Sequence, residues 1–173
     1  MLAPDLMNHG GGPDADRAQD FHEQATAAVR DVMPSEPVHL IGHSFGATLA
    51  LRIALDEPER VHTLTLIEPV LFCAASGPGR AAHDAVIADM DHQADPDGAA
   101  AIFMDLWGDA RFYDLPAPQQ EYIRTRMWIP SATEPALIHD NAKILGRLPD
   151  LSPSTLLVEG QNSPPVIAEI NDG

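Results

Sequence analysis

The sequence predicts an α/β fold with a parallel sheet, and three observations lead to this class. Residues 38–41 form a short apolar run closed by a glycine, which is typical of a buried strand. Residues 47–55 are rich in helix formers and apolar on most sides, and Pro58 ends that helix because proline cannot continue one. Residues 60–67 return to a strand pattern. Strand, helix and strand in this order form a parallel βαβ unit with a right-handed crossover.

The chain before this unit is predicted to contain a strand end, a loop and a helix. Residues 1–6 indicate the end of a strand that enters a loop. Residues 10–14 are rich in glycine but lack the lysine and the flanking pattern of a phosphate-binding loop, which argues against a nucleotide cofactor. Over residues 16–33, apolar side chains such as Phe21 and Val29 recur on one face, which predicts an amphipathic helix.

The pentapeptide Gly42-His43-Ser44-Phe45-Gly46 lies between the first predicted strand and its helix. This turn is expected to be too tight for large side chains at the two glycines and to hold Ser44 in a strained backbone with its hydroxyl exposed. The backbone N–H of Phe45, at the helix N-terminus, points where an oxyanion would form. The G-x-S-x-G pattern also occurs by chance, and the strand–turn–helix setting is what favours a functional interpretation.

After residue 74 the alternation of strands and helices stops. Residues 75–79 are predicted to be a linker, and helix-like stretches follow at residues 83–92, 98–107, 118–128 and 135–148. Most of the aromatic residues and methionines lie in this segment. Core packing accounts for the larger part of them, and some are expected to face a substrate pocket. Residues 154–160 then return to a strand pattern, and a helix is predicted to follow with Ser163 as its N-cap.

Composition limits the partners of the chain. Its 173 residues are enough for one domain with a core, and 45% of them are hydrophobic. The net charge of −16 argues against binding nucleic acid or an anionic membrane and is expected to serve solubility. Cys73 is the single cysteine, so no internal disulfide is possible, and we expect it to be a small core residue rather than a nucleophile. Without a long apolar run or a signal-peptide pattern, a cytoplasmic location is the default expectation.

The pentapeptide and its surroundings resemble the nucleophile elbow of the α/β-hydrolases. Residues 3–10, Ala-Pro-Asp-Leu-Met-Asn-His-Gly, resemble the Pro-Asp-Leu-x-Gly-His-Gly segment after the fourth strand of that superfamily, with Asn8 in the place of glycine. The resemblance implies a partial α/β-hydrolase fold, a mostly parallel sheet flanked by helices. It implies a core over residues 1–73 and 150–173 and a helical cap insertion over residues 74–149. The family's first strands and its last strand have no counterpart, so we expect a chain truncated at both ends.

The same resemblance implies a catalytic triad in the order serine, acid and histidine. It gives Ser44 the role of nucleophile and the N–H of Phe45 that of an oxyanion donor. The usual place of the aspartate is occupied by Ser163, so Glu68, at the end of the second strand, is the best substitute for the acid. The alternative for Glu68 is a loop residue that pairs locally. The histidine is expected beyond Gly173, because none of the eight histidines lies in the matching place.

Three further residues are candidates for substrate binding. His43 is expected to pack or form a hydrogen bond beside Ser44. His9 either lines the site or belongs to a surface loop, and Trp107 is one of the aromatic residues that a pocket would use. His139 is expected to lie far from the serine. No pair of residues has metal-ligand spacing, and the acidic cluster over residues 89–97 lacks the spacing of a calcium loop, so we expect no metal and no cofactor.

The sequence therefore predicts a serine hydrolase that acts on a carboxylic ester or related acyl bond of a small-molecule substrate. Thioesterase, C–C hydrolase and cofactor-free haloperoxidase chemistry remain open because all keep the serine. Turnover is expected to be very low in this chain, which lacks the matching histidine. The alternative is a non-catalytic, hydrolase-like binding module. Missing outer strands would also leave sheet edges and apolar surface exposed, which favours association of the chain.

Overall fold

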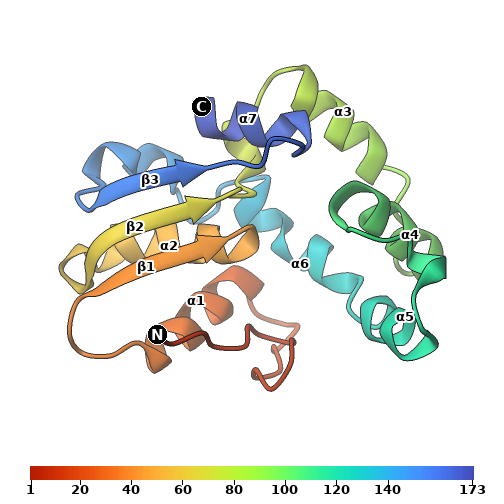
Figure 1. Ribbon diagram of the computed structural model, residues 1–173, viewed down its shortest axis with the longest axis horizontal. Helices are drawn as coiled ribbons and strands as arrows, with labels where there is room; N and C mark the ends of the chain where they lie inside the picture. The colour runs from red at the N-terminus through yellow and green to blue at the C-terminus, as the bar shows by residue number, and fades with distance from the viewer.

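The computed structural model describes residues 1–173 and places a three-stranded sheet beside a set of helices (Figure 1). The strands are β1 (Val38–His43), β2 (Val61–Ile67) and β3 (Ser154–Val158), and they lie in the order β1-β2-β3. Both pairs are parallel, with Gly42 opposite Leu66 and Leu66 opposite Leu157. The predicted α/β class and the parallel βαβ unit are therefore confirmed.

One helix precedes β1 and another follows it. Helix α2 (Phe45–Asp56) starts directly after Ser44, as predicted, and most of its residues are buried. Helix α1 (Phe21–Val32) begins five residues later than the predicted start at residue 16. The carboxylate of Asp20 accepts a hydrogen bond from the backbone N–H of Glu23 at 2.7 Å and so acts as the N-cap. Asp16 instead accepts from the N–H of Ala18 in a turn ahead of the helix.

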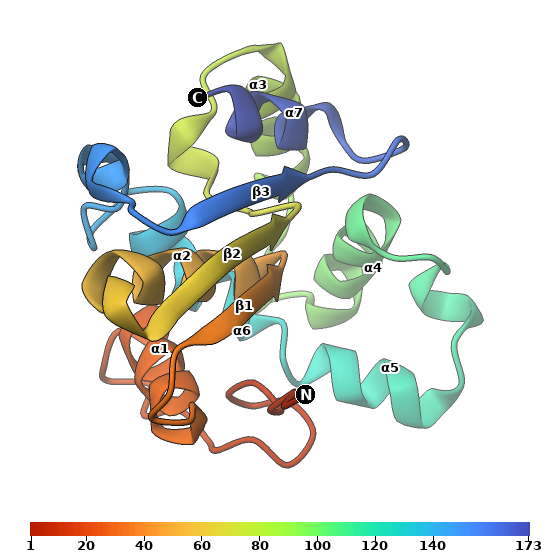
Figure 2. The ribbon, with the colours of Figure 1, turned by 60° about the vertical axis from the view of Figure 1, so that its left-hand side comes forward.

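The segment between β2 and β3 is helical, as expected, but its boundaries differ from the prediction. Its helices are α3 (Pro78–Ile87), α4 (Pro96–Trp107), α5 (Ala117–Arg124) and α6 (Trp128–Leu137). Short 3₁₀ turns lie at Pro58–Arg60, Phe72–Ala74, Phe112–Asp114 and Leu145–Asp150. Figure 2 shows α4 and α5 standing away from the sheet. The division of the chain into a core and a cap insertion stays a prediction.

The helix predicted over residues 135–148 is wrong. Helix α6 ends at Leu137 with Pro135 in its last turn, and the chain turns at Asp140, which has a φ of 45°. The carboxylate of Asp140 then accepts hydrogen bonds from the backbone N–H groups of Ile144 and Leu145, at 2.6 and 3.2 Å, ahead of the next 3₁₀ turn. An aspartate that tolerates this backbone conformation and caps the following amides interrupts the helix.

The C-terminal helix α7 (Pro165–Asp172) corrects a second prediction. Its N-cap position is Pro164, and no side chain caps it, so Ser163 is not the N-cap. The hydroxyl of Ser163 donates to Glu68 instead. Within α7, the carboxylate of Glu169 accepts hydrogen bonds from three backbone N–H groups at the start of α3, those of residues 77, 79 and 80. This contact explains why α3 starts at Pro78, inside the predicted linker.

The main hydrophobic core lies between the sheet and the helices on one side of it. It joins Ile53 of α2, Leu64 of β2 and Ile167 of α7, each 1% exposed or less. Cys73 packs against this core as predicted, and burial raises the pKa of its thiol to about 11. A separate small cluster around Phe112 holds α4 and α5 together. The outer helices therefore have a core of their own.

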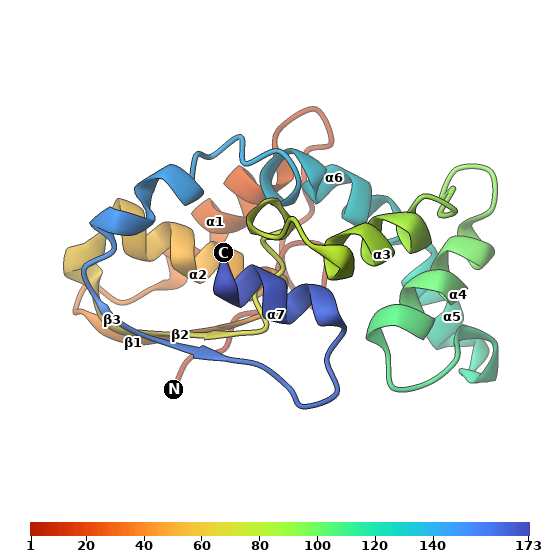
Figure 3. The same ribbon diagram turned by 90° about the horizontal axis from the view of Figure 1, so that it is seen from above.

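The other side of the sheet carries no helix (Figure 3). Every residue of β3 is exposed, and side chains of neighbouring strands form rows across this face, such as Ile41, Thr65 and Leu156. Ile41 is 66% exposed and Leu156 58% exposed. The sheet thus presents apolar side chains on an uncovered face. No helix is both long and apolar enough to cross a membrane.

Candidate active site

Ser44 lies at the sharp bend between β1 and α2. Its backbone has φ 53° and ψ −121°, a conformation that non-glycine residues rarely adopt. The N–H of Ser44 donates to the carbonyl of Ile67 at 2.9 Å, and its own carbonyl accepts from Ala47 N–H at 3.0 Å. These bonds fix the bend between the end of the sheet and the first turn of α2. Strain held by the surrounding structure is typical of functional positions.

The two glycines beside Ser44 differ in the space around them. A Cβ atom on Gly42 would lie 2.7 Å from the backbone nitrogen of Ala47 and 2.5 Å from its Cα, and closer still to the carbonyl oxygen of Gly46. A Cβ atom on Gly46 would meet only Leu6 Cδ1, at 4.0 Å. The sequence prediction that both positions are too tight for side chains is thus supported at Gly42, whereas Gly46 has room for a methyl group.

The first turn of α2 is held from behind by a buried histidine. His22 of α1 is fully buried, and its Nε2 lies 3.1 Å from Thr48 Oγ1, which in turn donates to the carbonyl of Phe45 at 2.8 Å. Because Arg52 approaches the Nδ1 of His22 at 3.5 Å, the proton is assigned to Nε2. As the first helical residue, Phe45 has an N–H with no acceptor inside the helix. Its role as an oxyanion donor stays a prediction.

Glu68 follows β2 and is surrounded by hydrogen-bond donors. Its Oε1 accepts from the hydroxyl of Ser163 and from Gly160 N–H, the latter at 2.8 Å, while its Oε2 lies 3.5 Å from His43 Nε2. The bond from Ser163 makes the largest contribution to lowering the pKa of Glu68, and Gly160 and His43 act in the same direction against the effect of burial. Glu68 is thus held as a carboxylate beside the residue in the usual aspartate position.

Replacing Ser163 with alanine is expected to raise the pKa of Glu68 towards its usual range, because the strongest of its three donors is lost. The chemical shift of the Glu68 carboxyl carbon, followed by NMR through an acid titration, measures this change. Ser154→Ala, at an exposed position in β3, is a matched control that should leave the titration unchanged. An unaltered titration of Glu68 in Ser163→Ala would contradict the assigned hydrogen bond.

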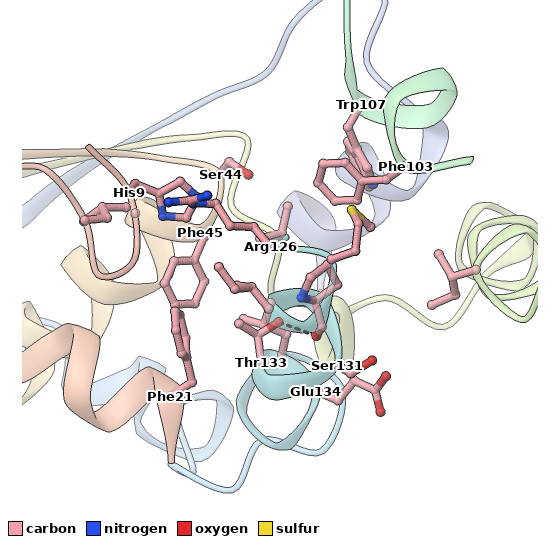
Figure 4. A pocket seen from close by; sticks show the side chains of 18 of the residues that line it. His9, Phe21, Ser44, Phe45, Phe103, Trp107, Arg126, Ser131, Thr133 and Glu134 are labelled. Atoms are coloured by element: carbon pink, nitrogen blue, oxygen red, sulfur yellow. Dashed lines mark hydrogen bonds between the residues drawn. The ribbon is translucent and has the colours of Figure 1, made fainter. Parts of the chain in front are cut away.

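A cavity of about 660 Å³ opens beside Ser44 (Figure 4). Of its 32 lining residues 18 are hydrophobic, which makes it suitable for a small, largely apolar molecule. The cavity brings together all six residues that the sequence singled out: His9, His43, Ser44, Phe45, Glu68 and Trp107. His139 is not among the lining residues, as expected. The juxtaposition of the six is observed, and their roles stay predictions.

The three candidate binding residues sit in different surroundings. His9 is exposed, and its Nδ1 lies 2.8 Å from the carbonyl of Met7. His43 has 65% of its side chain exposed, and its Nε2 lies 3.5 Å from Glu68 Oε2. Trp107 is half-buried beside Phe72, with ring centroids 6.2 Å apart. In Figure 4, His9 and Ser44 lie at one end of the cavity and Trp107 at the other.

Several lining residues were not predicted from the sequence. Arg126 follows α5, and Ser131 of α6 has its hydroxyl 3.4 Å from His92 Nδ1. His83 is buried and stacked on Phe72 at 4.2 Å between ring centroids. These residues belong to the helical segment, where no strand fixes the direction of a side chain. No group of three or more His, Cys, Asp or Glu side chains is arranged to hold a metal ion.

Comparison with known proteins identifies relatives of this chain. The model of the alpha/beta hydrolase family matches residues 1–171. Lipase LipV of Mycobacterium tuberculosis is 32% identical over 124 residues, which cover 71% of this chain and 47% of the lipase. A 2-hydroxymuconate semialdehyde hydrolase of Pseudomonas sp. strain CF600 is 34% identical over 70 residues, which cover 39% of this chain and 25% of that enzyme.

The fold also matches solved structures. The crystal structure of a bacterial membrane phospholipase A superposes with a TM-score of 0.61 at 20% identity, over 97% of this chain and 57% of the phospholipase. The chain spans about half the length of the lipase. The match of the family model to nearly the whole sequence, together with the parallel sheet, shows that this chain belongs to the alpha/beta hydrolase family.

Proposed function

We propose that this protein is a serine hydrolase in which Ser44 attacks a carboxylic ester or a related acyl bond of a small molecule. The observation that carries the proposal is the backbone of Ser44, held at φ 53° where β1 passes into α2, at the wall of the large apolar cavity. Hydrolase relatives, among them a lipase, support the reaction class. The helices between residues 74 and 149 supply much of the lining and would act as the cap.

In the proposed reaction, Ser44 Oγ attacks the acyl carbon and its proton passes to a base. The carbonyl oxygen becomes an oxyanion, which accepts a hydrogen bond from the N–H of Phe45 at the start of α2. Collapse of the tetrahedral intermediate releases the leaving group and forms an acyl-enzyme, which water then hydrolyses. Glu68 would orient and stabilise a cationic base through Oε2, the oxygen that His43 approaches.

The acid is the part of the triad that departs from its expected position. The usual aspartate position holds Ser163, whose hydroxyl donates a hydrogen bond to Glu68. Among the residues of this chain, a cavity histidine such as His9 or His43, or a water molecule, is available to accept the proton of Ser44. The serine at the aspartate position favours the second candidate function, a non-catalytic binding module that uses the cavity without chemistry.

A fluorophosphonate probe separates the two functions, because it labels only an activated serine. We expect covalent labelling at Ser44, located by mass spectrometry, and its loss in Ser44→Ala. Ser131→Ala is the matched control, since Ser131 also lines the cavity and its hydroxyl lies 3.4 Å from His92 Nδ1. That variant should label as the unchanged protein does. Labelling at Ser131, or no labelling of the folded chain, would reject Ser44 as the nucleophile, and the second result would favour the binding module.

A further inference from the structure

Most of the basic residues of this protein are paired with carboxylates. The sequence has ten Lys and Arg residues against 26 Asp and Glu residues. Seven of the ten lie within 4.0 Å of a carboxylate oxygen, namely Arg30, Arg52, Arg60, Arg80, Arg111, Arg124 and Arg147. The three without such a partner are Arg17, Arg126 and Lys143, and of these only Arg126 lines the cavity beside Ser44.

Arg126 is held in place by neutral groups. Its Nε donates to the carbonyl of Asn8 at 2.6 Å, and its Nη1 donates to the carbonyl of Tyr122 at 3.0 Å and to the hydroxyl of Thr125 at 3.2 Å. The guanidinium carbon lies 3.7 Å from the centre of the Tyr122 ring. The remaining nitrogen, Nη2, has no hydrogen-bond partner in the protein. These contacts fix the guanidinium in advance and leave one of its edges free for a ligand.

The acidic residues of the cavity do not neutralise this charge. Asp5 accepts a hydrogen bond from Gly11 N–H at 2.8 Å, and Glu68 is held by Ser163 and Gly160. Glu134 is exposed on α6 and forms no ion pair. Arg126 is half-buried at the wall of a largely apolar cavity and has no carboxylate partner in the protein, so an anion in the cavity would have no competing counter-ion.

We propose that Nη2 of Arg126 binds a carboxylate of the substrate. The substrate class is then an acyl compound with an apolar body and a free carboxylate, the apolar part lying towards Phe103 and Trp107 (Figure 4). Charge-assisted hydrogen bonds from arginine to carboxylate are among the strongest in proteins. The local cation also offsets the net charge of −16, which otherwise repels anions from this protein. That the bound compound is a substrate rests on the proposed function. The carboxylate site itself is tested by binding alone, without turnover.

The test compares two probes of the same shape, 4-phenylbutyrate and its neutral amide 4-phenylbutyramide. Calorimetric titration of the full chain should show the carboxylate binding at least about tenfold more tightly than the amide. Arg126→Gln is expected to abolish this preference. Arg17→Gln is the matched control, because it removes the same charge from an arginine that stacks on Trp128 outside the cavity. It should leave the preference unchanged.

The outcomes separate this inference from the proposed function. Equal dissociation constants of the two probes in the unchanged protein, or no binding of the carboxylate, would overturn the carboxylate site even if the fluorophosphonate labels Ser44. An unlabelled Ser44 together with a persistent preference for the carboxylate would overturn the reaction and retain the site. Because Arg126 also donates a hydrogen bond to the carbonyl of Asn8, circular dichroism should verify that Arg126→Gln keeps the fold. Arg126→Lys keeps the charge and should retain a smaller preference.

Discussion

Replacing Gly42 with alanine is expected to destabilise the fold by about 3 kcal/mol or more. The new methyl group would lie within 2.7 Å of the backbone nitrogen of Ala47, and backbone atoms at the start of a buried helix cannot move aside as a flexible side chain can. Helix α2 would have to shift away from β1, which would open the core on both of its sides. Urea unfolding followed by circular dichroism measures the loss as a lower midpoint.

Gly46→Ala provides the control, because the same change is made four residues away in the same motif. Its methyl group would have 4.0 Å of clearance from Leu6, and alanine favours a helix over glycine by up to about 1 kcal/mol. We expect a stability equal to or slightly above that of the unchanged protein. Equal destabilisation by both substitutions would contradict the difference in clearance between Gly42 and Gly46.

The stability of the protein is expected to fall by about 3 kcal/mol between pH 6.5 and pH 4 because of His22. Burial, helped by the charge of Arg52, lowers the pKa of this histidine from 6.5 to about 4, while Asp20 and Asp56 act in the opposite direction. Between pH 4 and pH 6.5, His22 is protonated in the unfolded chain but neutral in the folded chain. The free energy of unfolding therefore rises with pH in this window. The contribution is complete above pH 6.5 and lost below about pH 4.

His22→Gln isolates this contribution. Glutamine can still donate to Thr48, but it does not titrate. The slope of the free energy of unfolding against pH between 4 and 6.5 should therefore fall by the amount that corresponds to about one proton. His139→Gln, at an exposed position, should leave the dependence unchanged. Urea unfolding at several pH values within this window gives the slope for each variant. An unchanged slope in His22→Gln would show that other groups are responsible for the acid sensitivity.

The sequence predicted the central part of the fold because there local pattern and tertiary role agree. The apolar runs of β1 and β2 and the glycine at residue 42 are each sufficient to place a strand or a bend, and together they place Ser44. Outside this unit, side chains decided the boundaries. The helix after residue 135 stops because Asp140 caps later amides, and Ser163 bonds a carboxylate 95 residues away instead of its own helix. Neither contact leaves a periodic signal.

The cavity was predictable in outline only. Aromatic residues in the helical segment indicated a pocket, and Trp107 lies at the wall of the cavity, although its predicted binding role stays a prediction. Arg126 could not be singled out, because an arginine in a helical stretch is ordinarily a solvent-exposed residue. Its position depends on a bond to Asn8, 118 residues away, and on the ring of Tyr122. Such long-range contacts follow from the packing of the helices against the N-terminal loop, which the sequence pattern alone does not describe.

Pairing of two copies through the uncovered face of the sheet would make the measured stability depend on protein concentration. Two chains that met through Ile41 and Leu156 would bury apolar area worth about 25 cal/mol for each Å². Mass action then adds to the apparent free energy of unfolding as the protein becomes more concentrated. A ranking of variants by their unfolding midpoints therefore holds only among samples prepared at the same dilution.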